Sequence, residues 1–318
     1  SNLNALDPDE FELFQIDDGF ETFVGDWMDI DPVKFPNGLA YIVKKVHAKG
    51  MLAGLWLAPF VCETKSRIYA EHPDWLYREN GQEVFAGSNW SGDVVLDIRK
   101  SEVQDYIGRC LKFYRDMGFD FFKLDFLYAA VMIREGNDKT RAETMRAGME
   151  MLRKYLPDEM ILGCGVPLSS AFGLVDYCRV GPDVSLVFDD VAYMRIMHRE
   201  RISTKITLQN TIFRACMDGS VFRCDPDVFL LRDDNIKLSK EQRRALVMIN
   251  HLCGSVYMTS DNVGEYDKEK RKLLEEARTL SRAELNDVVC EKKRITLKYT
   301  LDGKEGELIY DPKNGVLL

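Results

Sequence analysis

The stretch FDFFKLDF, residues 119–126, is a short and largely apolar run that ends in the charged residues Lys123 and Asp125. We predict a buried strand here, because aromatic residues favour the pleated surface of a sheet. Side chains two positions apart on a strand point to the same side, so Lys123 and Asp125 share one face. Burying such a charged pair is costly without a purpose, and the pair therefore predicts a functional site at the end of this strand.

Similar apolar runs with polar endings alternate with longer amphipathic stretches along most of the chain. This alternation is typical of repeated βα units around a parallel sheet. We expect strands at residues 11–16, 52–57, 94–98 (a minor one), 119–126, 160–164, 175–180, 220–223 and 255–258. We expect helices at residues 39–48, 101–117, 139–155, 203–217 and 240–252.

Two helix starts carry recognisable capping signals. Ser101 with Glu102 has the form of an N-cap and an acidic first turn, and Ser239 with Gln242 has the form of a capping box. After residue 287 the pattern changes to strict alternation over residues 295–301, followed by an Asp-Gly turn and a second apolar run, which indicates an antiparallel hairpin. We therefore expect a barrel domain over residues 1–283 and a C-terminal β-hairpin or partial β-domain over residues 284–318.

Carboxylates follow several of the expected strands. They lie at residues 17–18, 125, 183, 225–227 and 261. A single Asp after a strand equally serves as a helix cap or a turn former, but five such strand ends exceed what structure alone requires. In a (β/α)8 barrel these loops converge on one mouth. We therefore expect a (β/α)8 TIM-type barrel, of class α/β, with a carboxylate-lined mouth.

The composition excludes several function classes. The 318 residues carry a formal net charge of -9, which argues against nucleic-acid binding because that needs a basic face. No apolar run approaches the roughly 18 residues of a membrane span, and the first twenty residues do not resemble a signal peptide. These features predict a soluble, cytoplasmic protein that binds neither nucleic acid nor a membrane.

Cysteine and histidine are dispersed. The eight cysteines form no CxxC pair, and the four histidines (His47, His72, His198 and His251) form neither HxH nor HExxH. We expect most of the thiols to be reduced and buried, and we expect neither a metal site nor a Ser/His/Asp triad. The chemistry must then depend on carboxylates.

Two carboxylates without a metal cluster fit glycoside hydrolysis, in which one attacks or stabilises the sugar and the other transfers a proton. We take Asp125 and Asp183 as this pair. Lys123 would keep Asp125 ionised, whereas partial burial would raise the pKa of Asp183 and Arg179 would oppose that rise. For a retaining mechanism we expect the two carboxyls to lie roughly 5 to 6 Å apart.

Other polar and aromatic residues suit sugar binding. Asp17 and Asp18 in tandem can accept hydrogen bonds from adjacent sugar hydroxyls. Trp27, Trp56 and Trp90 offer flat faces for a sugar ring, although a tryptophan is equally often part of a core.

Seven motifs in order resemble the α-galactosidases of glycoside hydrolase family 36. They are FQIDDGF (14–20), GDW (25–27), GLWLAPF (54–60), HPDW (72–75), FKLDF (122–126), LGCG (162–165) and RVGPD (179–183). The resemblance runs from about residue 10 to residue 262, and the C-terminal hairpin resembles the start of that family's β-sandwich.

The resemblance implies a retaining mechanism without a metal or an organic cofactor. Asp125 would be the nucleophile of the KxD motif and Asp183 the acid/base of the RxxxD motif. Asp17 and Asp18 would hold the 4- and 6-hydroxyls of galactose. By the same resemblance the ring hydroxyls and the sugar subsite would be contacted by Lys123, Arg179, Cys164, Trp56 and Trp90.

The chain departs from the family pattern at its start. Residues 11–16 resemble the second barrel strand, and about ten residues precede them. We therefore expect strands two to eight without the first, so that this chain alone would form an open barrel with exposed strand edges.

We expect an enzyme that cleaves terminal α-linked galactose from oligosaccharides such as raffinose or melibiose. The family resemblance also implies a homo-oligomer. Transfer to another sugar, action on α-N-acetylgalactosamine, or a catalytically silent sugar-binding fragment are the alternatives. A metal-dependent hydrolase built on Asp225 and Asp227 lacks histidine ligands. We expect residues 225–227 to form a structural loop with Arg223 as its partner.

Overall fold

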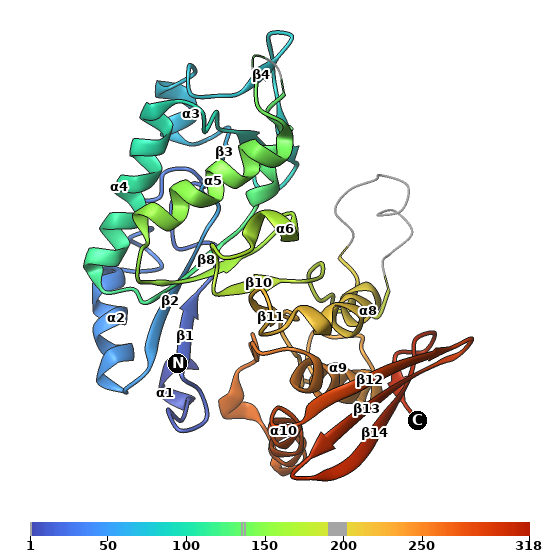
Figure 1. Ribbon diagram of the computed structural model, residues 1–318. Coiled ribbons are helices and arrows are strands. Elements are labelled where there is room, and N and C mark those ends of the chain that lie inside the picture. The colour runs from blue at the N-terminus through green and yellow to red at the C-terminus, as the bar shows by residue number, and fades with distance from the viewer. Residues whose placement is uncertain (1, 135, 137, 190–201) are drawn as a thin grey trace. The chain divides into compact units, whose positions relative to one another are not determined.

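The computed structural model describes residues 2–134, 136, 138–189 and 202–318. The chain divides into two compact units, Leu6–Asp176 and Tyr177–Leu318 with Ser1–Ala5, which we call the N-terminal and C-terminal units. In Figure 1 the N-terminal unit runs from blue to green and the C-terminal unit from yellow-green to red.

A parallel sheet forms the centre of the N-terminal unit, with strands in the order β1 (Leu13–Ile16), β2 (Leu52–Leu57), β8 (Phe121–Leu124) and β9 (Met160–Gly163). Leu55, Phe122 and Ile161, one from each of three neighbouring strands, are fully buried. Continuous apolar runs of this kind are what a sheet covered on both faces requires.

Helices follow these strands along the chain (Figure 1): α2 (Gly38–Ala48), α4 (Ser101–Met117) and α5 (Arg141–Tyr155). Helix α4 buries Val103, Ile107, Leu111 and Tyr114, which recur at helical spacing along one stripe, and it ends at Gly118 in the left-handed conformation. Lys100, not Ser101, occupies the N-cap position of α4 and makes no side-chain cap. The predicted N-cap at Ser101 was wrong, because the helix begins at that residue and the Ser101 hydroxyl bonds to Glu102 instead.

Smaller elements complete the N-terminal unit. They are the antiparallel sheet of β3 (Val61–Glu63), β7 (Asp93–Val95) and β6 (Phe85–Gly87), the pair β4 (Arg78–Glu79) and β5 (Gln82–Glu83), and the short helices α3 (Arg67–Glu71), η1 (Leu127–Met132) and α6 (Leu168–Ala171). The minor strand expected at residues 94–98 is β7. It pairs with β3 and β6 in the small antiparallel sheet.

The C-terminal unit contains the parallel pair β10 (Tyr177–Arg179) and β11 (Arg223–Asp225). Its helices are α1 (Asn2–Ala5), α8 (Thr204–Arg214), η2 (Ala215–Met217), α9 (Lys240–Cys253), η3 (Val263–Glu265) and α10 (Lys268–Leu280). The capping box predicted at Ser239 and Gln242 is confirmed at the start of α9.

The expected strand at residues 255–258 was wrong. Ser255 donates one backbone hydrogen bond to Cys224, and Met258 accepts one from Phe229. These single bonds hold an extended segment without forming a strand, since a ladder needs successive pairs. The strand expected at residues 220–223 lies further along the chain, at Arg223–Asp225, and is β11.

An antiparallel sheet ends the chain, with β12 (Glu284–Glu291), β13 (Arg294–Leu301), β14 (Lys304–Asp311) and β15 (Val316–Leu317) in that order. The predicted turn at Asp302 and Gly303 joins β13 to β14, and both residues have positive φ. Helix α9 contacts β12 and β15, and Leu297 and Tyr310 are buried. Although β12 begins at the expected boundary, the division at residues 283 and 284 as a domain boundary stays a prediction.

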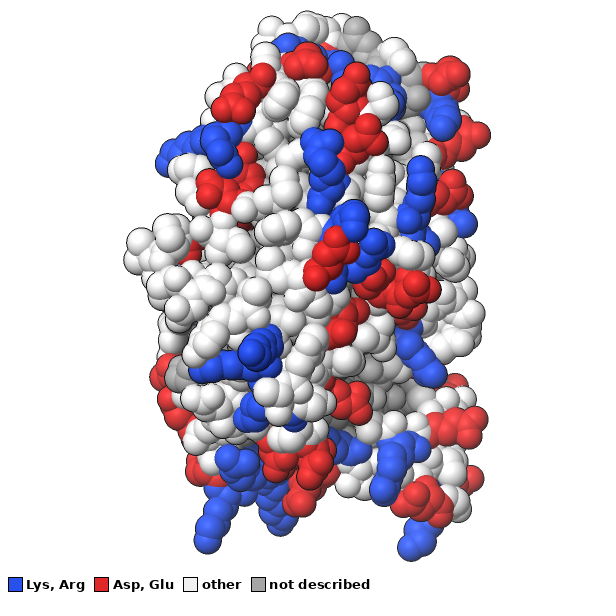
Figure 2. Space-filling model, turned by 90° about the vertical axis from the view of Figure 1, so that its left-hand side faces the viewer, with Lys and Arg blue, Asp and Glu red and all other residues white. Residues whose placement is uncertain are grey.

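Charged side chains of both signs are interspersed with uncharged residues on the described part of the face shown in Figure 2. This face therefore carries no continuous basic track of the kind that binds a phosphate backbone. Among the described residues, none of the helices combines the length and the apolar character that crossing a membrane requires.

His251 on α9 gives a test of the C-terminal unit. Its ring is buried, stacks on Tyr257 with ring centroids 4.3 Å apart, and has Nδ1 2.8 Å from the Val247 carbonyl oxygen. Burial lowers the pKa of His251 from 6.5 to about 4. Between pH 6.5 and about pH 4, His251 therefore binds a proton in the unfolded chain but not in the folded chain. The free energy of unfolding falls as the pH is lowered through this range.

We predict that lowering the pH from about 7.5 to about 5 removes about 2 kcal/mol more unfolding free energy from the wild-type protein than from a His251→Phe variant. Denaturant unfolding at the two pH values measures this difference. An equal loss in both proteins would show that His251 is not excluded from protonation in the folded state.

Candidate active site

Asp125 follows β8, and the parallel register determines its neighbours. Trp56 on β2 is the register partner of Lys123, two residues before Asp125. The Trp56 indole Nε1 donates to Asp125 Oδ2 at 3.1 Å, and the Phe126 amide donates to Asp125 Oδ1 at 2.7 Å. Phe126 has a positive φ of 52°, so the chain turns sharply directly after Asp125. Both carboxyl oxygens of Asp125 are thus held by donors.

Lys123 forms an ion pair with Asp17, at the end of β1. The Lys123 Nζ atom lies 3.0 Å from Asp17 Oδ2, and the Gln15 side-chain amide donates to the same oxygen at 2.7 Å. The Lys123 side chain is 12% exposed and that of Asp17 is 52% exposed. The sequence led us to expect this ammonium group near Asp125, and that placement stays a prediction; in the structure the Lys123 ammonium group pairs with Asp17.

Asp18 is linked to the loop between β6 and β7. The Trp90 indole Nε1 donates to Asp18 Oδ2 at 3.0 Å. The Trp90 ring is half-buried, and its centroid lies 6.0 Å from that of Trp56 and 5.1 Å from that of Phe126. A loop far along the chain therefore delivers an aromatic side chain to the carboxyl ends of β1, β2 and β8.

The segment after β9 also reaches Asp125. Cys164 is buried and its amide donates to the Leu124 carbonyl oxygen at 2.8 Å. Gly165 has φ of +60°, and a Cβ atom there would lie 3.4 Å from Asp125 Oδ1 and 3.2 Å from the Tyr128 ring. The sequence analysis named Cys164 as a site residue but not Gly165. The available signal was a glycine close behind the end of a strand, which often marks a close approach of the backbone to another group.

Two of the three tryptophans considered as sugar platforms are buried. Trp27 is 1% exposed and Trp56 is 2% exposed, and their ring centroids lie 5.8 Å apart. Trp27 is therefore a core residue and offers no open ring face. Trp56 presents its indole N–H to Asp125, so its contact with the site is polar.

In the C-terminal unit Arg179 gathers three carboxylates. Its guanidinium contacts Asp183 Oδ1 at 2.8 Å, Asp225 Oδ2 at 2.7 Å and Asp227 Oδ1 at 2.7 Å. The side chains of Arg179, Asp225 and Asp227 are 3%, 0% and 8% exposed, whereas that of Asp183 is 51% exposed. Asp183 therefore meets solvent while a buried cation holds one of its oxygens.

The partner expected for residues 225–227 was wrong. Arg223 lies 3.6 Å from Asp218, whereas Arg179 binds both Asp225 and Asp227. The parallel pairing of β10 with β11 places Arg179 directly opposite Asp225, which explains why Arg179 rather than Arg223 is the partner. Asp225 and Asp227, considered only as loop formers or metal ligands, thus position Arg179.

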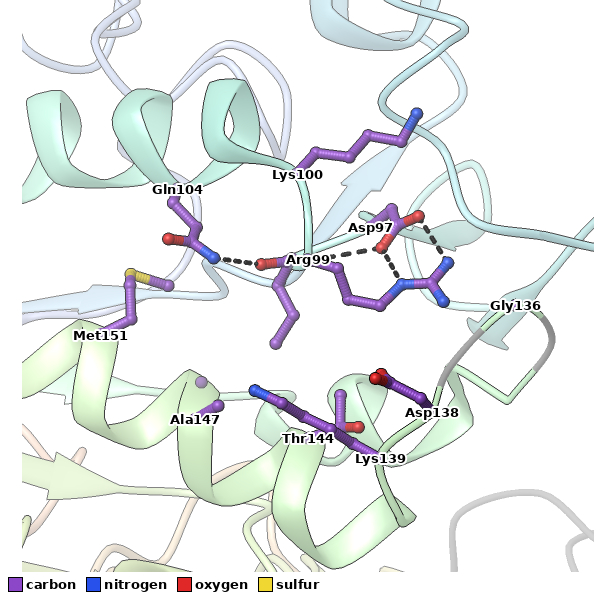
Figure 3. Close-up of a pocket in the computed structure, with 12 residues that line it drawn as sticks. Asp97, Arg99, Lys100, Gln104, Gly136, Asp138, Lys139, Thr144, Ala147 and Met151 are labelled. Carbon is purple, nitrogen blue, oxygen red and sulfur yellow. Dashed lines mark hydrogen bonds and ion pairs between the residues drawn. The ribbon is translucent and has the colours of Figure 1, made fainter.

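A cavity of about 480 Å³ lies between the start of α4 and the first half of α5 (Figure 3). Its polar groups are partly engaged with one another, since Arg99 Nε and Asp97 Oδ1 are 2.7 Å apart and Gln104 donates to the Ile98 carbonyl oxygen. None of the predicted site residues lines this cavity.

None of the eight cysteines is part of a disulfide in the structure, and six of them are buried, as the sequence predicted. Burial raises the pKa of Cys62 and of Cys110 to about 12, so neither is a reactive thiolate. Within the described ranges no group of three or more His, Cys, Asp or Glu residues is arranged to hold a metal ion. His198 lies outside the described residues.

Comparison with known proteins identifies the N-terminal unit. The melibiase family matches residues 6–156. Residues 6–156 therefore resemble a melibiase domain. The chain is also 33% identical over 122 residues to an α-galactosidase of Lactobacillus acidophilus, an alignment that covers 36% of this chain and 16% of that protein. It is 29% identical over 177 residues to an α-galactosidase of Escherichia coli, with 52% and 24% covered.

The solved structure of an α-galactosidase from Thermus thermophilus, in complex with p-nitrophenyl α-D-galactopyranoside, superposes on 95% of this chain and 61% of that chain, with a TM-score of 0.80 and 30% identity. An α-galactosidase from Mortierella vinacea shares the fold at 14% identity and a TM-score of 0.68. The melibiase domain and these likenesses confirm the expected fold class, a TIM-type α/β barrel with an antiparallel appendage. The chain spans only 16% to 24% of the length of the two curated relatives.

Gly165 gives a test of the melibiase site. If Asp125 reacts with an aryl α-galactoside, as proposed in the next subsection, Gly165→Ala should lower its turnover about tenfold. The new Cβ atom lies 3.2 Å from the Tyr128 ring, so groups beside Asp125 must shift, and small misplacements of a reacting group are costly. Gly173→Ala is the matched control, since Gly173 has φ of +72° and open space around it. Both variants bear the same backbone strain, so a comparable loss of turnover in the two would contradict a specific role for the space beside Asp125.

Proposed function

We propose that this chain is the catalytic part of a retaining α-galactosidase, with Asp125 as the nucleophile and Asp183 as the acid/base. The observation that carries the proposal is the placement of Asp125. It lies at the carboxyl end of β8 within the melibiase domain, with both oxygens held by Trp56 and Phe126. In barrel enzymes this end of the strands is where catalytic groups lie.

The proposed reaction is a double displacement. Asp125 attacks the anomeric carbon while Asp183 gives a proton to the departing oxygen, and a galactosyl ester forms on Asp125. Asp183 then takes a proton from water, which attacks the same carbon and releases galactose with its α configuration retained. Each oxygen of Asp125 accepts one of the two hydrogen bonds described above, and a carboxylate has about four acceptor sites. A lone pair thus remains for the sugar.

Sugar recognition would come from the other residues that the sequence singled out. Asp17 and Asp18 would accept hydrogen bonds from the 4- and 6-hydroxyls of galactose, while Lys123 and Arg179 would donate to other ring hydroxyls. Trp90 and Cys164 would line the sugar, and Trp56 would hold Asp125 as it reacts. The ion pair of Lys123 with Asp17 and the bond from Trp90 to Asp18 support these roles because they hold the two carboxylates in place.

The proposed substrates are small α-galactosides such as melibiose and raffinose. The Thermus thermophilus relative has been solved with p-nitrophenyl α-D-galactopyranoside and also with stachyose. The likeness to that protein favours the same class of substrate for this chain. A cytoplasmic location and self-association stay predictions.

Replacement of the nucleophile tests the proposal. We predict that Asp125→Asn lowers the turnover of p-nitrophenyl α-galactoside about a thousandfold or more, because an amide cannot form the glycosyl ester. Asp116→Asn, on the exposed face of α4, should leave turnover unchanged. Release of p-nitrophenol measures both. Undiminished turnover in Asp125→Asn would remove Asp125 from its role, and a wild-type protein without turnover would contradict the proposed function.

A further inference from the structure

Glu21 is a buried carboxyl group close to the proposed sugar site, and no role has been given to it above. It lies three residues after Asp18 and is 5% exposed, whereas Asp18 is exposed. The turn that contains it is closed by backbone hydrogen bonds from Asp31 to Phe20 at 2.8 Å and from Thr22 to Asp29 at 2.9 Å. The backbone thus holds the Glu21 side chain in the interior.

Phe20, the residue directly before Glu21, lies in a cluster of buried aromatic side chains. Phe20 and Tyr114 are fully buried, with ring centroids 5.7 Å apart, and Trp27 lies beside them at 6.5 Å from Phe20. In the part of the chain that the structure describes, Glu21 forms no ion pair and its Oε2 atom has no hydrogen-bond partner. A buried carboxylate without a cation is unfavourable, so this site favours the neutral acid.

Two titratable groups face Glu21: Asp18 from its own loop and Tyr114 from α4. The Tyr114 hydroxyl donates to the Trp27 carbonyl oxygen, so its proton is already engaged there. The pKa of Glu21 is raised to about 8, mainly by burial and also by its hydrogen bond to Asp18, while the Glu21 and Gly19 amides oppose the rise.

The hydrogen bond between the Glu21 and Asp18 side chains requires a proton. Two ionised carboxylates are both acceptors, so they form such a bond only when one of them is protonated. Because Glu21 is buried and Asp18 is exposed, the proton belongs on Glu21. Asp18 is thus held by two donors, the Glu21 acid and the Trp90 indole.

We propose that Glu21 is a positioning residue that, as a neutral carboxylic acid, holds the Asp18 carboxylate in the orientation that galactose requires. This inference rests on the proposed function. When Glu21 ionises at alkaline pH, the donor is lost and a second negative charge appears beside Asp18. Sugar binding then weakens, while the reacting carboxylate Asp125 is unaffected.

The expected effect is therefore on KM rather than on kcat. For the wild-type protein we expect KM for p-nitrophenyl α-galactoside to rise about tenfold between about pH 7 and about pH 9. Glu21→Gln keeps a hydrogen-bond donor that does not ionise, so its KM should stay within about twofold of the wild-type value at pH 7 and should not rise. Glu21→Leu removes the donor, so its KM should be about tenfold higher at every pH.

Two controls accompany these variants. Glu12→Gln, at an exposed position before β1, should keep the wild-type pH dependence. Titration of the Glu21 side-chain carboxyl by carbon-13 nuclear magnetic resonance, with Glu21→Gln used for assignment, tests the shared proton without any sugar. We expect an inflection near pH 8 in the wild-type protein.

A KM for Glu21→Gln that rises with pH as in the wild-type protein would overturn the inference, even if Glu21→Leu fails to fold. So would a Glu21 carboxyl that titrates near pH 4.5. A wild-type protein that shows the inflection near pH 8 but does not hydrolyse the galactoside would contradict the proposed function and would support the proton-sharing pair.

Discussion

Parallel pairing of β2 with β8 is the constraint on which the N-terminal site depends. The register places Trp56 opposite Lys123, and so brings the Trp56 indole within reach of Asp125 two residues later. A shift of one residue would turn every side chain of the strand to the opposite face. The same pairing direction delivers the ends of β1 and β9 to the same edge, where Asp17 meets Lys123 and Gly165 lies beside Asp125.

Each carboxylate of the proposed site has a specific donor, and this is how the fold tolerates so many of them together. Lys123 neutralises Asp17, the Trp90 indole donates to Asp18, and indole and amide donors hold Asp125. In the C-terminal unit one buried guanidinium serves three carboxylates. Loss of a partner from such a buried group leaves an uncompensated charge, which costs about 3 to 5 kcal/mol.

The sequence predicted most of the local elements, but not the contacts between distant segments. The run FFKLD specifies both a strand and the side on which Lys123 and Asp125 lie. Glu21, in contrast, resembles any polar loop residue, because its burial arises from a turn closed by residues 29–31. Arg179 and Asp225 are 46 residues apart in the sequence and meet only because β10 pairs with β11 in this register. The sequence does not show that register, so Arg223 was wrongly predicted as the partner of residues 225–227. Helix α10 was missed because only three of its residues are buried and most of the others are charged.

The most direct test of the account is to trap the covalent intermediate. A fluorinated α-galactosyl fluoride reacts with a retaining enzyme and leaves a slowly hydrolysed glycosyl ester, because fluorine on the ring destabilises the charge that develops in the transition state. Digestion and mass spectrometry then locate the added mass. The account predicts one fluorogalactosyl group on the peptide that contains Asp125. A label on another carboxylate, or no label on a protein that hydrolyses α-galactosides, would contradict it.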